Sequence, residues 1–283
     1  MTDPVLFGPT PAPGLHVMSV NIRRRMRSMM PADRWTRRAP ALADLLCSEE
    51  PALIGMQEAL PDQAAYLRDE LGPAYRMVGR GRETGSRGEG CPLFFDTRRL
   101  ELLDWDQQAL SDRPDTPGSV SWGNRIPRVM VSATLRDRAT SAVLLMINTH
   151  LDHLSAPSRL RAARAVRERV SAAHLPAVVT GDMNAGERSV AIRELLADGV
   201  LRDSWTAAAE RTTPEWGTFP AYRAPRRRRK RIDWIMVTPD VEVVRAGINT
   251  RQPRGRWVSD HLPVQAVIIP RAGAIPHGED GQA

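Results

Sequence analysis

Several predicted strands of this chain end in polar side chains that can bind a cation or a phosphate group. In Val178–Gly186, an apolar run with strand character ends in Asp182, and Asn184 follows two residues later. A turn is one interpretation, because Asp and Asn side chains bond to neighbouring backbone. The other is that the strand presents both side chains to one site, since residues two apart in a strand share a face. Similar positions elsewhere in the chain hold Asn21, Glu58, His150, Asp152, Asp233, Asp260 and His261.

The residue types in this set suit hydrolysis of a phosphoester. Carboxylate and amide oxygens are hard ligands, which Mg²⁺ and Mn²⁺ prefer. A divalent ion beside a phosphate neutralises charge and orients a water molecule. A histidine next to a carboxylate can exchange a proton near neutral pH. The chain has 2 cysteines, Cys47 and Cys91, which fit neither a disulfide framework nor a zinc site, so we expect buried or half-buried thiols.

The bulk composition predicts a globular protein with an anionic partner. The 283 residues are 42% hydrophobic, enough for a large core, and the formal net charge is +7. Much of the excess charge lies in one run, PRRRRKR, at Pro225–Arg231. A nucleic acid, a phosphorylated metabolite or a membrane surface would each suit this charge.

The elements that must position the polar set alternate between strands and helices. Neighbouring strands often form hairpin-like pairs, which predicts mixed sheets with helices outside them. Pro40 predicts a late start or a kink in the first helix, and residues 104–127 are expected to be irregular. We predict a loose segment at 1–14, one domain at 15–270 and a frayed tail at 271–283. Strands are predicted at 16–22, 52–58, 75–79, 92–96, 128–136, 142–150, 177–184, 231–237, 241–248 and 264–270, and helices at 35–49, 61–71, 156–173 and 187–198.

The ordered motifs VNIR, QE, NTHLDH, TGDMN, RIDWIMV and SDHLPV resemble the endonuclease/exonuclease/phosphatase superfamily. The resemblance spans about residues 16–269. It implies an α/β protein with the DNase-I-like fold, a four-layer α/β/β/α sandwich of two mixed, mainly antiparallel sheets. It also implies Mg²⁺ as the cofactor, with Mn²⁺ as a substitute. Met183 and Trp234 stand where the family often has Phe and Tyr, and we expect local repacking there.

The resemblance also implies roles for the residues that bind the metal and the water. Glu58 is expected to be the principal metal ligand, with Asn21 and Asp260 as ligands either directly or through water. Asp182 and Asn184 are expected to orient the attacking water and the phosphate. Asp182 would act as the general base or as a ligand of a second metal.

Two histidine–carboxylate pairs complete the catalytic set that the resemblance implies. His261 is expected to contact the phosphate, with Asp233 orienting its ring. His150 is expected to protonate the leaving oxygen, with Glu89 as its carboxylate partner.

Residues around the site are candidates for substrate binding. Arg128 is the favoured phosphate clamp, because arginine bonds to phosphate oxygens in bidentate fashion. Trp122 and Trp216 have two interpretations, stacking on a base or sugar and packing in the core. The basic run 226–231 also has two, a track for a polyanion backbone and a solvated, mobile loop. The remaining candidates are Arg80, Arg82, Arg125 and Asp152.

Three functions remain open from the sequence. The first is a metal-dependent phosphodiesterase or nuclease that acts on nucleic acid or nucleotides. The second is a phosphatase or phosphodiesterase acting on a small phosphorylated sugar, inositol or lipid head group, and the third is a binding module without catalysis. The first residues lack the features of a signal peptide and no segment is long enough to cross a bilayer, so a cytoplasmic location is expected, with no obligate protein partner.

Overall fold

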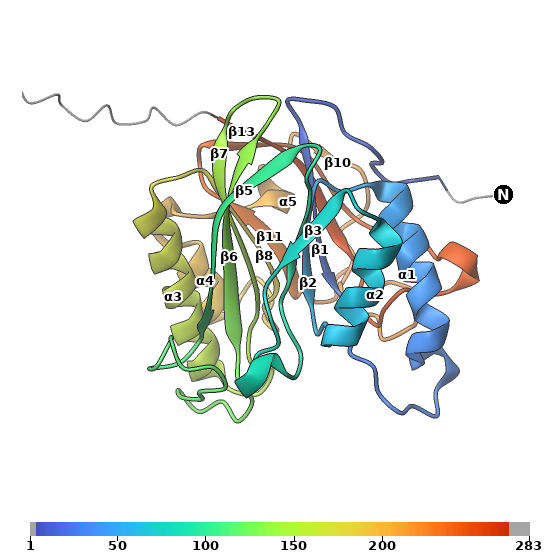
Figure 1. The fold of residues 1–283 in the computed structure, drawn as a ribbon, viewed down its shortest axis with the longest axis horizontal. Coiled ribbons are helices and arrows are strands. Elements are labelled where there is room, and N and C mark those ends of the chain that lie inside the picture. Colours follow the sequence, from blue (N-terminus) through green and yellow to red (C-terminus); the bar gives the residue numbers. More distant parts are fainter. Residues whose placement is uncertain (1–3, 272–283) are drawn as a thin grey trace, which may run out of the picture.

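A computed structural model describes residues 4–271 of the chain. Two sheets pack face to face, and helices cover the outer face of each (Figure 1). The predicted four-layer α/β/β/α architecture is therefore confirmed. The helices are α1 (Trp35–Glu49) and α2 (Pro61–Leu71) on one side, α3 (Ala156–Ala173) and α4 (Val190–Leu195) on the other, and the short α5 (Ser204–Ala207).

Both sheets are mixed and mainly antiparallel, as predicted. The parallel neighbours are β1 with β2, β7 with β8 and β10 with β12. The first sheet has the order β10 (Glu210–Arg211), β12 (Val241–Ile248), β13 (Val264–Pro270), β1 (Leu15–Asn21), β2 (Leu53–Gln57), β4 (Leu93–Asp96) and β3 (Tyr75–Val78). The second has the order β5 (Leu100–Ala109), β6 (Val129–Asp137), β7 (Val143–His150), β8 (Ala177–Asp182), β11 (Asp233–Val237) and β9 (Arg202–Asp203).

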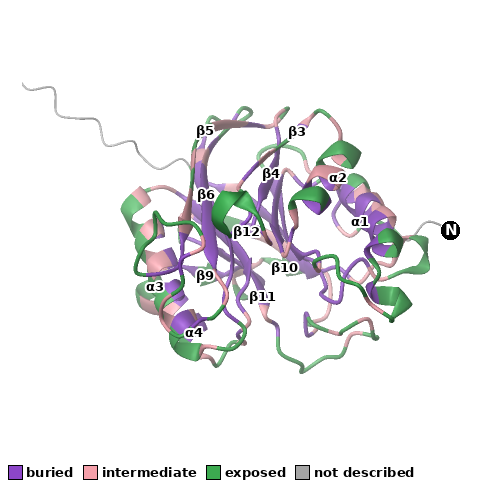
Figure 2. Cartoon of the chain, turned by 60° about the horizontal axis from the view of Figure 1, so that its bottom comes forward, coloured by how far each residue is buried: buried purple, intermediate pink, exposed green. Residues whose placement is uncertain are grey.

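Alternation along the central strands divides the core into three parts. In β1, Leu15 and Val17 pack between the sheets, whereas Met18 and Val20 pack under α1 and α2. In β8, Val178 faces the other sheet and Val179 faces α3 and α4. The central strands are thus buried on both faces, which Figure 2 shows as a purple interior. A fully apolar strand is the expected pattern for such a position.

A buried polar contact fixes the spacing of the two sheets near one end. Gln57 Nε2 on β2 donates to Asn148 Oδ1 on β7 over 2.7 Å, and Asn148 Nδ2 donates to the Met56 carbonyl over 2.7 Å. Gly55 lies beside this contact, where an added Cβ would lie 2.1 Å from Thr180 Oγ1. The sheets therefore approach too closely here for any side chain at position 55.

The sequence predicted most elements, and four expectations need correction. The first part of the expected irregular segment 104–127 belongs to β5, an edge strand whose polar outward side chains hid it. The expected helix 187–198 is only α4, because Ser189 caps its start and a 3₁₀ turn, Ala197–Gly199, follows it. Helix α1 begins at Trp35 and continues through Pro40, so its start is not delayed. Cys47 is exposed, although Cys91 is buried as expected.

The N-terminal segment is anchored to the domain where it was expected to be loose. The backbone N–H groups of Leu6, Phe7 and Gly8 donate to the buried carboxylate of Glu49 at 2.8–3.2 Å. The predicted frayed tail lies outside the described residues except for Arg271. Among the described helices, none combines the length and the apolar character that crossing a bilayer requires.

Candidate active site

The predicted polar residues meet at one end of the sandwich. Asn21, His150 and Asp182 are the last residues of β1, β7 and β8, and Asp233 is the first residue of β11. Asp182 is paired in register with His150 on one neighbouring strand and with Asp233 on the other. All four residues share the alternation of the side chains that pack between the sheets. Where the apolar run stops, this inward face becomes a polar site.

The amide of Asn21 joins the groups that come from the two sheets. Its Nδ2 lies 3.1 Å from Glu58 Oε1, 3.0 Å from Asp182 Oδ2 and 3.5 Å from His261 Nε2. Its Oδ1 accepts the backbone N–H of Arg23 at 2.9 Å. In this orientation Asn21 holds two carboxylates together as a donor. The predicted role of direct metal ligand would require the amide to turn over so that its oxygen faces the site.

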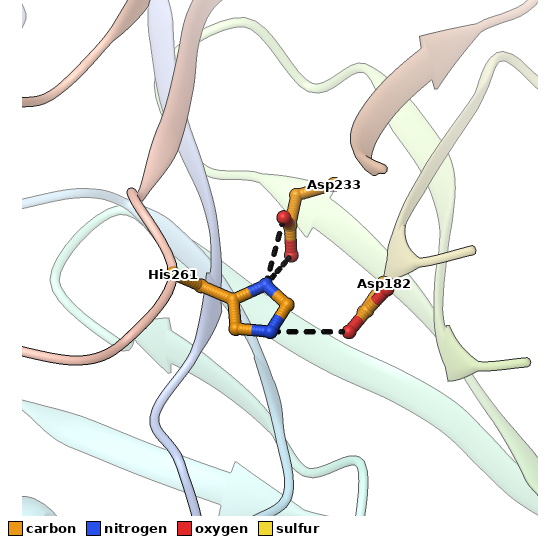
Figure 3. A group of neighbouring side chains, drawn as sticks. All are labelled: Asp182, Asp233 and His261. Carbon is orange, nitrogen blue, oxygen red and sulfur yellow. Dashed lines mark hydrogen bonds and ion pairs between the residues drawn. The ribbon is translucent and has the colours of Figure 1, made fainter. Parts of the chain in front are cut away.

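His261 lies between two carboxylates, as Figure 3 shows. Its Nδ1 lies 2.9 Å from Asp233 Oδ2, and its Nε2 lies 3.7 Å from Asp182 Oδ2. Burial lowers the pKa of His261, but Asp233 and Asp182 outweigh burial and raise it to about 10. The ring is therefore an imidazolium at neutral pH, with one N–H held by Asp233 and the other directed at the site.

Asp182 holds a proton more readily than a surface carboxylate does, because its pKa is raised. Burial and the nearby charge of Asp233 raise its pKa to about 7, against the lowering effects of His261, Asn184 and Asn21. Its Oδ1 accepts the Asn184 backbone N–H at 2.9 Å, which fixes the side chain. A carboxylate with a pKa near 7 can accept a proton from water and release it again at neutral pH.

Glu58 reaches the site through a turn of the backbone. Alternation along β2 sends Gln57 between the sheets, so the next residue would point toward the helices. Glu58 instead has φ of 59°, in the left-handed region that non-glycine residues seldom adopt. Its carboxylate consequently lies beside Asn21 and accepts the Arg24 N–H at 3.1 Å. Burial raises the pKa of Glu58, but the bonds from Arg24 and Asn21 leave it below its usual range.

The donor set at Glu58 and Asp260 fits a divalent cation of the Mg²⁺ type. Burial raises the pKa of Asp260, and the charge of Glu58 raises it further, against the opposing effects of His261 and Arg23. Two carboxylates that repel each other in a buried place are stabilised by a cation between them. Asp182, Asp233 and His261 also lie within 4.8 Å of one another, but the imidazolium already supplies the positive charge there. Glu58 and Asp260 thus offer oxygen ligands without a histidine between them, although Arg23 Nε lies 3.6 Å from Asp260 Oδ2.

His150 lies in the site in its neutral form. Burial, Arg128 and Arg82 lower its pKa well below the ordinary value. Its Nε2 lies 3.0 Å from Asn184 Nδ2, which also donates to the Leu151 carbonyl. The ring therefore accepts at Nε2 and carries its hydrogen on Nδ1, which has no hydrogen-bond partner among the described residues. A neutral ring can donate a hydrogen bond, but it lacks the second proton of a general acid.

The expected pairing of Glu89 with His150 is wrong. Glu89 Oε2 lies 3.0 Å from Arg82 NH1, and its Oε1 lies 3.1 Å from Arg24 NH1. Two guanidinium groups occupy the carboxylate, which leaves it no role in orienting His150. The short motif around Glu89 gave its chain position but not the side chains that surround it.

Arg128 and Asp152 form a buried pair next to His150. Arg128 Nε lies 3.5 Å from Asp152 Oδ2, and its NH2 bonds to His153 Nδ1 at 2.9 Å. Neither Nε nor NH1 of Arg128 has a hydrogen-bond partner among the described residues. The NH1 donor of Arg128 is thus unused among the described residues, and a role as phosphate clamp stays a prediction. Asp152 instead accepts the N–H groups of Leu154 and Ser155, so it shapes the turn and positions Arg128.

Three other predicted binding residues, Trp122, Trp216 and Arg80, contact side chains outside the catalytic set. Trp122 packs at the edge of the core under α3, and its Nε1 donates to Asp112. Arg80 lies over the ring of Trp105, and Trp216 lies under Arg227. Arg125 is exposed. These contacts favour packing over stacking for Trp122.

Two further residues touch the site and were not predicted from the sequence. Thr218 Oγ1 accepts the backbone N–H of Asp233 at 3.1 Å, which fixes the start of β11. The ring of Phe219 lies 4.8 Å from the ring of His261, and 51% of Phe219 is exposed. The segment GTFP has no strand pattern, so only an exposed aromatic between two predicted strands could have marked it.

The whole chain is similar to proteins with known structures. The sequence profile described as "Endonuclease/Exonuclease/phosphatase family" matches residues 18–261, and no curated protein matches. A family protein from Bacteroides vulgatus is 30% identical, with a TM-score of 0.84 over 90% of this chain and 98% of that one. A mannosyl-6-phosphatase from Bacteroides thetaiotaomicron is 28% identical, with a TM-score of 0.83 over 90% and 99%. The zebrafish (D. rerio) TDP2, solved with a single-strand DNA product, shares the fold, with 17% identity and a TM-score of 0.70 over 90% and 99%.

Proposed function

Because this chain belongs to the endonuclease/exonuclease/phosphatase family, we propose that it is a divalent-metal-dependent phosphodiesterase acting on nucleic acid or nucleotides. The observation that carries the proposal is the Asn21 amide, whose nitrogen lies within 3.5 Å of Glu58, Asp182 and His261 at once. A binding module has no need of a carboxylate with a raised pKa beside a buried imidazolium.

Each catalytic side chain has a separate task in this proposal. Asp182 takes a proton from the attacking water, because its pKa of about 7 allows it to act as a base. Asn184 shares its turn and limits where that water can lie. His261 presents its free N–H to a phosphate oxygen, and Asp233 keeps the ring charged and oriented. The imidazolium then stabilises the negative charge that grows on the phosphate.

Glu58 and Asp260 would hold the cation, with Asn21 nearby. When bound, Mg²⁺ supplies Lewis-acid chemistry that neutralises the phosphate and the departing oxygen. His150 is neutral, so we assign it a hydrogen bond to the substrate and give the positive charge to His261. Arg128 is the clamp for a second phosphate oxygen, through NH1, which has no hydrogen-bond partner among the described residues.

Metal removal and two variants test this function. We expect hydrolysis of single-stranded DNA, RNA or a simple phosphodiester to stop in EDTA and to return with Mg²⁺ or Mn²⁺. Glu58→Gln and His261→Asn should each lower kcat/KM by roughly a hundredfold or more, because the first removes a charge that would hold the cation and the second removes a charge that acts on the phosphate. Glu101→Gln is the control, since this carboxylate lies on the edge strand β5 and pairs with Arg136. Activity that persists in EDTA, or wild-type rates in both variants, would contradict the proposal.

A second candidate is a phosphatase for a small phosphorylated sugar. It is favoured by the mannosyl-6-phosphatase that shares 28% of its residues with this chain. Turnover of sugar phosphates without any cleavage of diesters, under the same metal conditions, would select this candidate.

A further inference from the structure

A large basic groove lies next to the catalytic end of the sandwich. It encloses about 1080 Å³, and its walls include Gly186–Ser189, Glu215, Arg227–Arg231 and Trp234. Gly186 follows Asn184 by two residues, and Trp234 follows Asp233 directly. The groove is thus lined by residues close in the chain to Asn184 and Asp233, although Trp234 itself packs on the α3 and α4 side of the sheet. Its volume exceeds what one phosphate ester of a sugar would fill.

The basic segment of this groove, Arg227–Lys230, carries positive charge that no acidic residue from 4 to 271 neutralises. All four side chains are exposed, and none forms an ion pair with any residue from 4 to 271. Arg231, by contrast, is buried and forms a bidentate pair with Asp203 at 3.0 and 2.6 Å. Arg231 is therefore a structural arginine, whereas the four cations of the basic segment have no acidic partner among residues 4–271. Consecutive cations without partners suit a ligand with several negative charges.

The basic segment is held in place by the chain beside it. The Gly217 N–H donates to the Arg226 carbonyl at 3.1 Å, and the Thr218 N–H donates to the Lys230 carbonyl at 3.3 Å. An added Cβ at Gly217 would lie 2.4 Å from the Cβ of Arg229, so only glycine permits this close packing. These bonds favour a fixed surface over the mobile loop that the charge run also allowed.

The same neighbouring segment links the groove to the catalytic centre. Thr218 binds the basic segment through its N–H and binds Asp233 through its hydroxyl. The next residue is Phe219, whose exposed ring lies against His261. Lys230 precedes Asp233 by three residues, so their Cα atoms lie within about 10 Å. Through Thr218 and Phe219, the chain therefore connects the basic segment with the buried ring of His261.

We propose that the basic segment and Phe219 form a binding site for single-stranded nucleic acid, which leads the strand to the catalytic centre. The inference rests on the proposed function, because it assigns the substrate class of that site. The cations would follow successive phosphates, and Phe219 would stack on a base near the scissile bond. An unpaired strand is required, since a base inside a duplex cannot offer its face to the ring.

Charge removal in the groove provides the main test. The variant Arg227→Gln/Arg228→Gln/Arg229→Gln is compared with Arg68→Gln/Arg76→Gln/Arg138→Gln, which removes the same charge elsewhere. Binding of a short fluorescent single-stranded oligonucleotide is followed in EDTA over a range of salt concentrations. The groove variant should bind roughly tenfold more weakly at low salt, with a salt slope lower by about 2, since each phosphate contact contributes about 0.7. The control variant should bind like the wild type.

Phe219 is tested by a size change and by its conservative replacement. Phe219→Ala should weaken binding of the single strand by about fivefold or more, whereas Phe219→Tyr should retain it.

Hydrolysis of bis(p-nitrophenyl) phosphate in Mg²⁺ should stay near wild type in the groove variant, because this small diester does not reach the cations.

The outcomes separate this inference from the proposed function. Wild-type affinity and salt slope in the groove variant would overturn the inference, and so would a loss of duplex binding with single-strand binding intact. If the wild type binds the oligonucleotide through the groove but hydrolyses no phosphodiester in Mg²⁺ or Mn²⁺, the proposed function fails while the binding site stands.

Discussion

Two buried carboxylates at different places in the sandwich have opposite surroundings. Glu49, at the end of α1, accepts the N–H groups of residues 6–8, the amide of Asn249 and the guanidinium of Arg251. Burial raises its pKa, but these donors outweigh burial and leave the pKa below its usual range. Asp182 has few donors and a second carboxylate nearby, and its pKa is raised to about 7.

The difference separates a group that stabilises the fold from a group that can do chemistry. A buried carboxylate whose oxygens are all bonded contributes to stability and has nothing left for a substrate. A buried carboxylate with a raised pKa lowers the stability of the fold when it is charged, and such groups are common at active sites. Substitutions at the two positions should therefore affect different properties.

The largest expected effect is the loss of activity in Asp182→Asn. Without the carboxylate no base accepts the proton of water, so kcat/KM should fall by about a thousandfold. The free energy of unfolding of the metal-free variant at pH 8 should stay the same or rise by about 1 kcal/mol. The reason is that the variant no longer buries a negative charge beside Asp233. Steady-state kinetics and urea unfolding measure the two quantities, with Asp198→Asn as the exposed control. If Asp182→Asn instead lowered the free energy of unfolding and kept full activity, Asp182 would be a stabilising group like Glu49.

Glu49→Gln should show the opposite behaviour. An amide cannot accept all of the donors that surround Glu49, and it carries no charge to pair with the guanidinium of Arg251. We expect the free energy of unfolding to fall by about 3 kcal/mol. The kcat/KM of the folded fraction should remain that of the wild type. Glu168→Gln on α3 is the matched control, because Glu168 is exposed.

The smallest effect concerns the pH dependence of stability near Glu49. His16 Nδ1 lies 3.1 Å from the Glu49 carbonyl, and burial lowers the pKa of His16 from 6.5 to about 4, against the raising effect of Glu49. The unfolded chain therefore binds a proton before the folded protein does, and stability falls as the pH drops from 6.5 toward 4. Between pH 7 and pH 5 this amounts to about 2 kcal/mol.

His16→Asn removes this titration and retains a donor for the Glu49 carbonyl. Urea unfolding of both proteins at several pH values should give curves that converge with acidification, since the wild type loses more. Parallel curves would show that His16 is protonated equally in the folded and unfolded states.

The sequence predicted the fold and most of the site for a definite reason. Asn21, His150, Asp182 and Asp233 obey the two-residue alternation of strands, so the pattern that predicts the core also predicts where they point. Glu58 breaks that alternation, and only a left-handed backbone brings it to the site. No single-residue propensity indicates such a turn at a glutamate, so its position was inferred from the family motif.

The errors arose where contacts depend on distant residues. Glu89 was correctly placed near the site, but its partners Arg24 and Arg82 come from loops whose paths the sequence does not indicate. Strand β5 was missed because an edge strand exposes one face and has a polar pattern. Thr218 and Phe219 lie in a loop without periodicity, so no role was predicted for them.

The close contact of Gln57 with Asn148, behind which Gly55 leaves no room for a side chain, has a consequence for how the enzyme arises. Asn21 and Glu58 belong to one sheet, while His150, Asp182 and Asp233 belong to the other. Neither sheet holds a working set of groups by itself. Catalytic competence therefore requires both sheets to lie at the separation that these amides set.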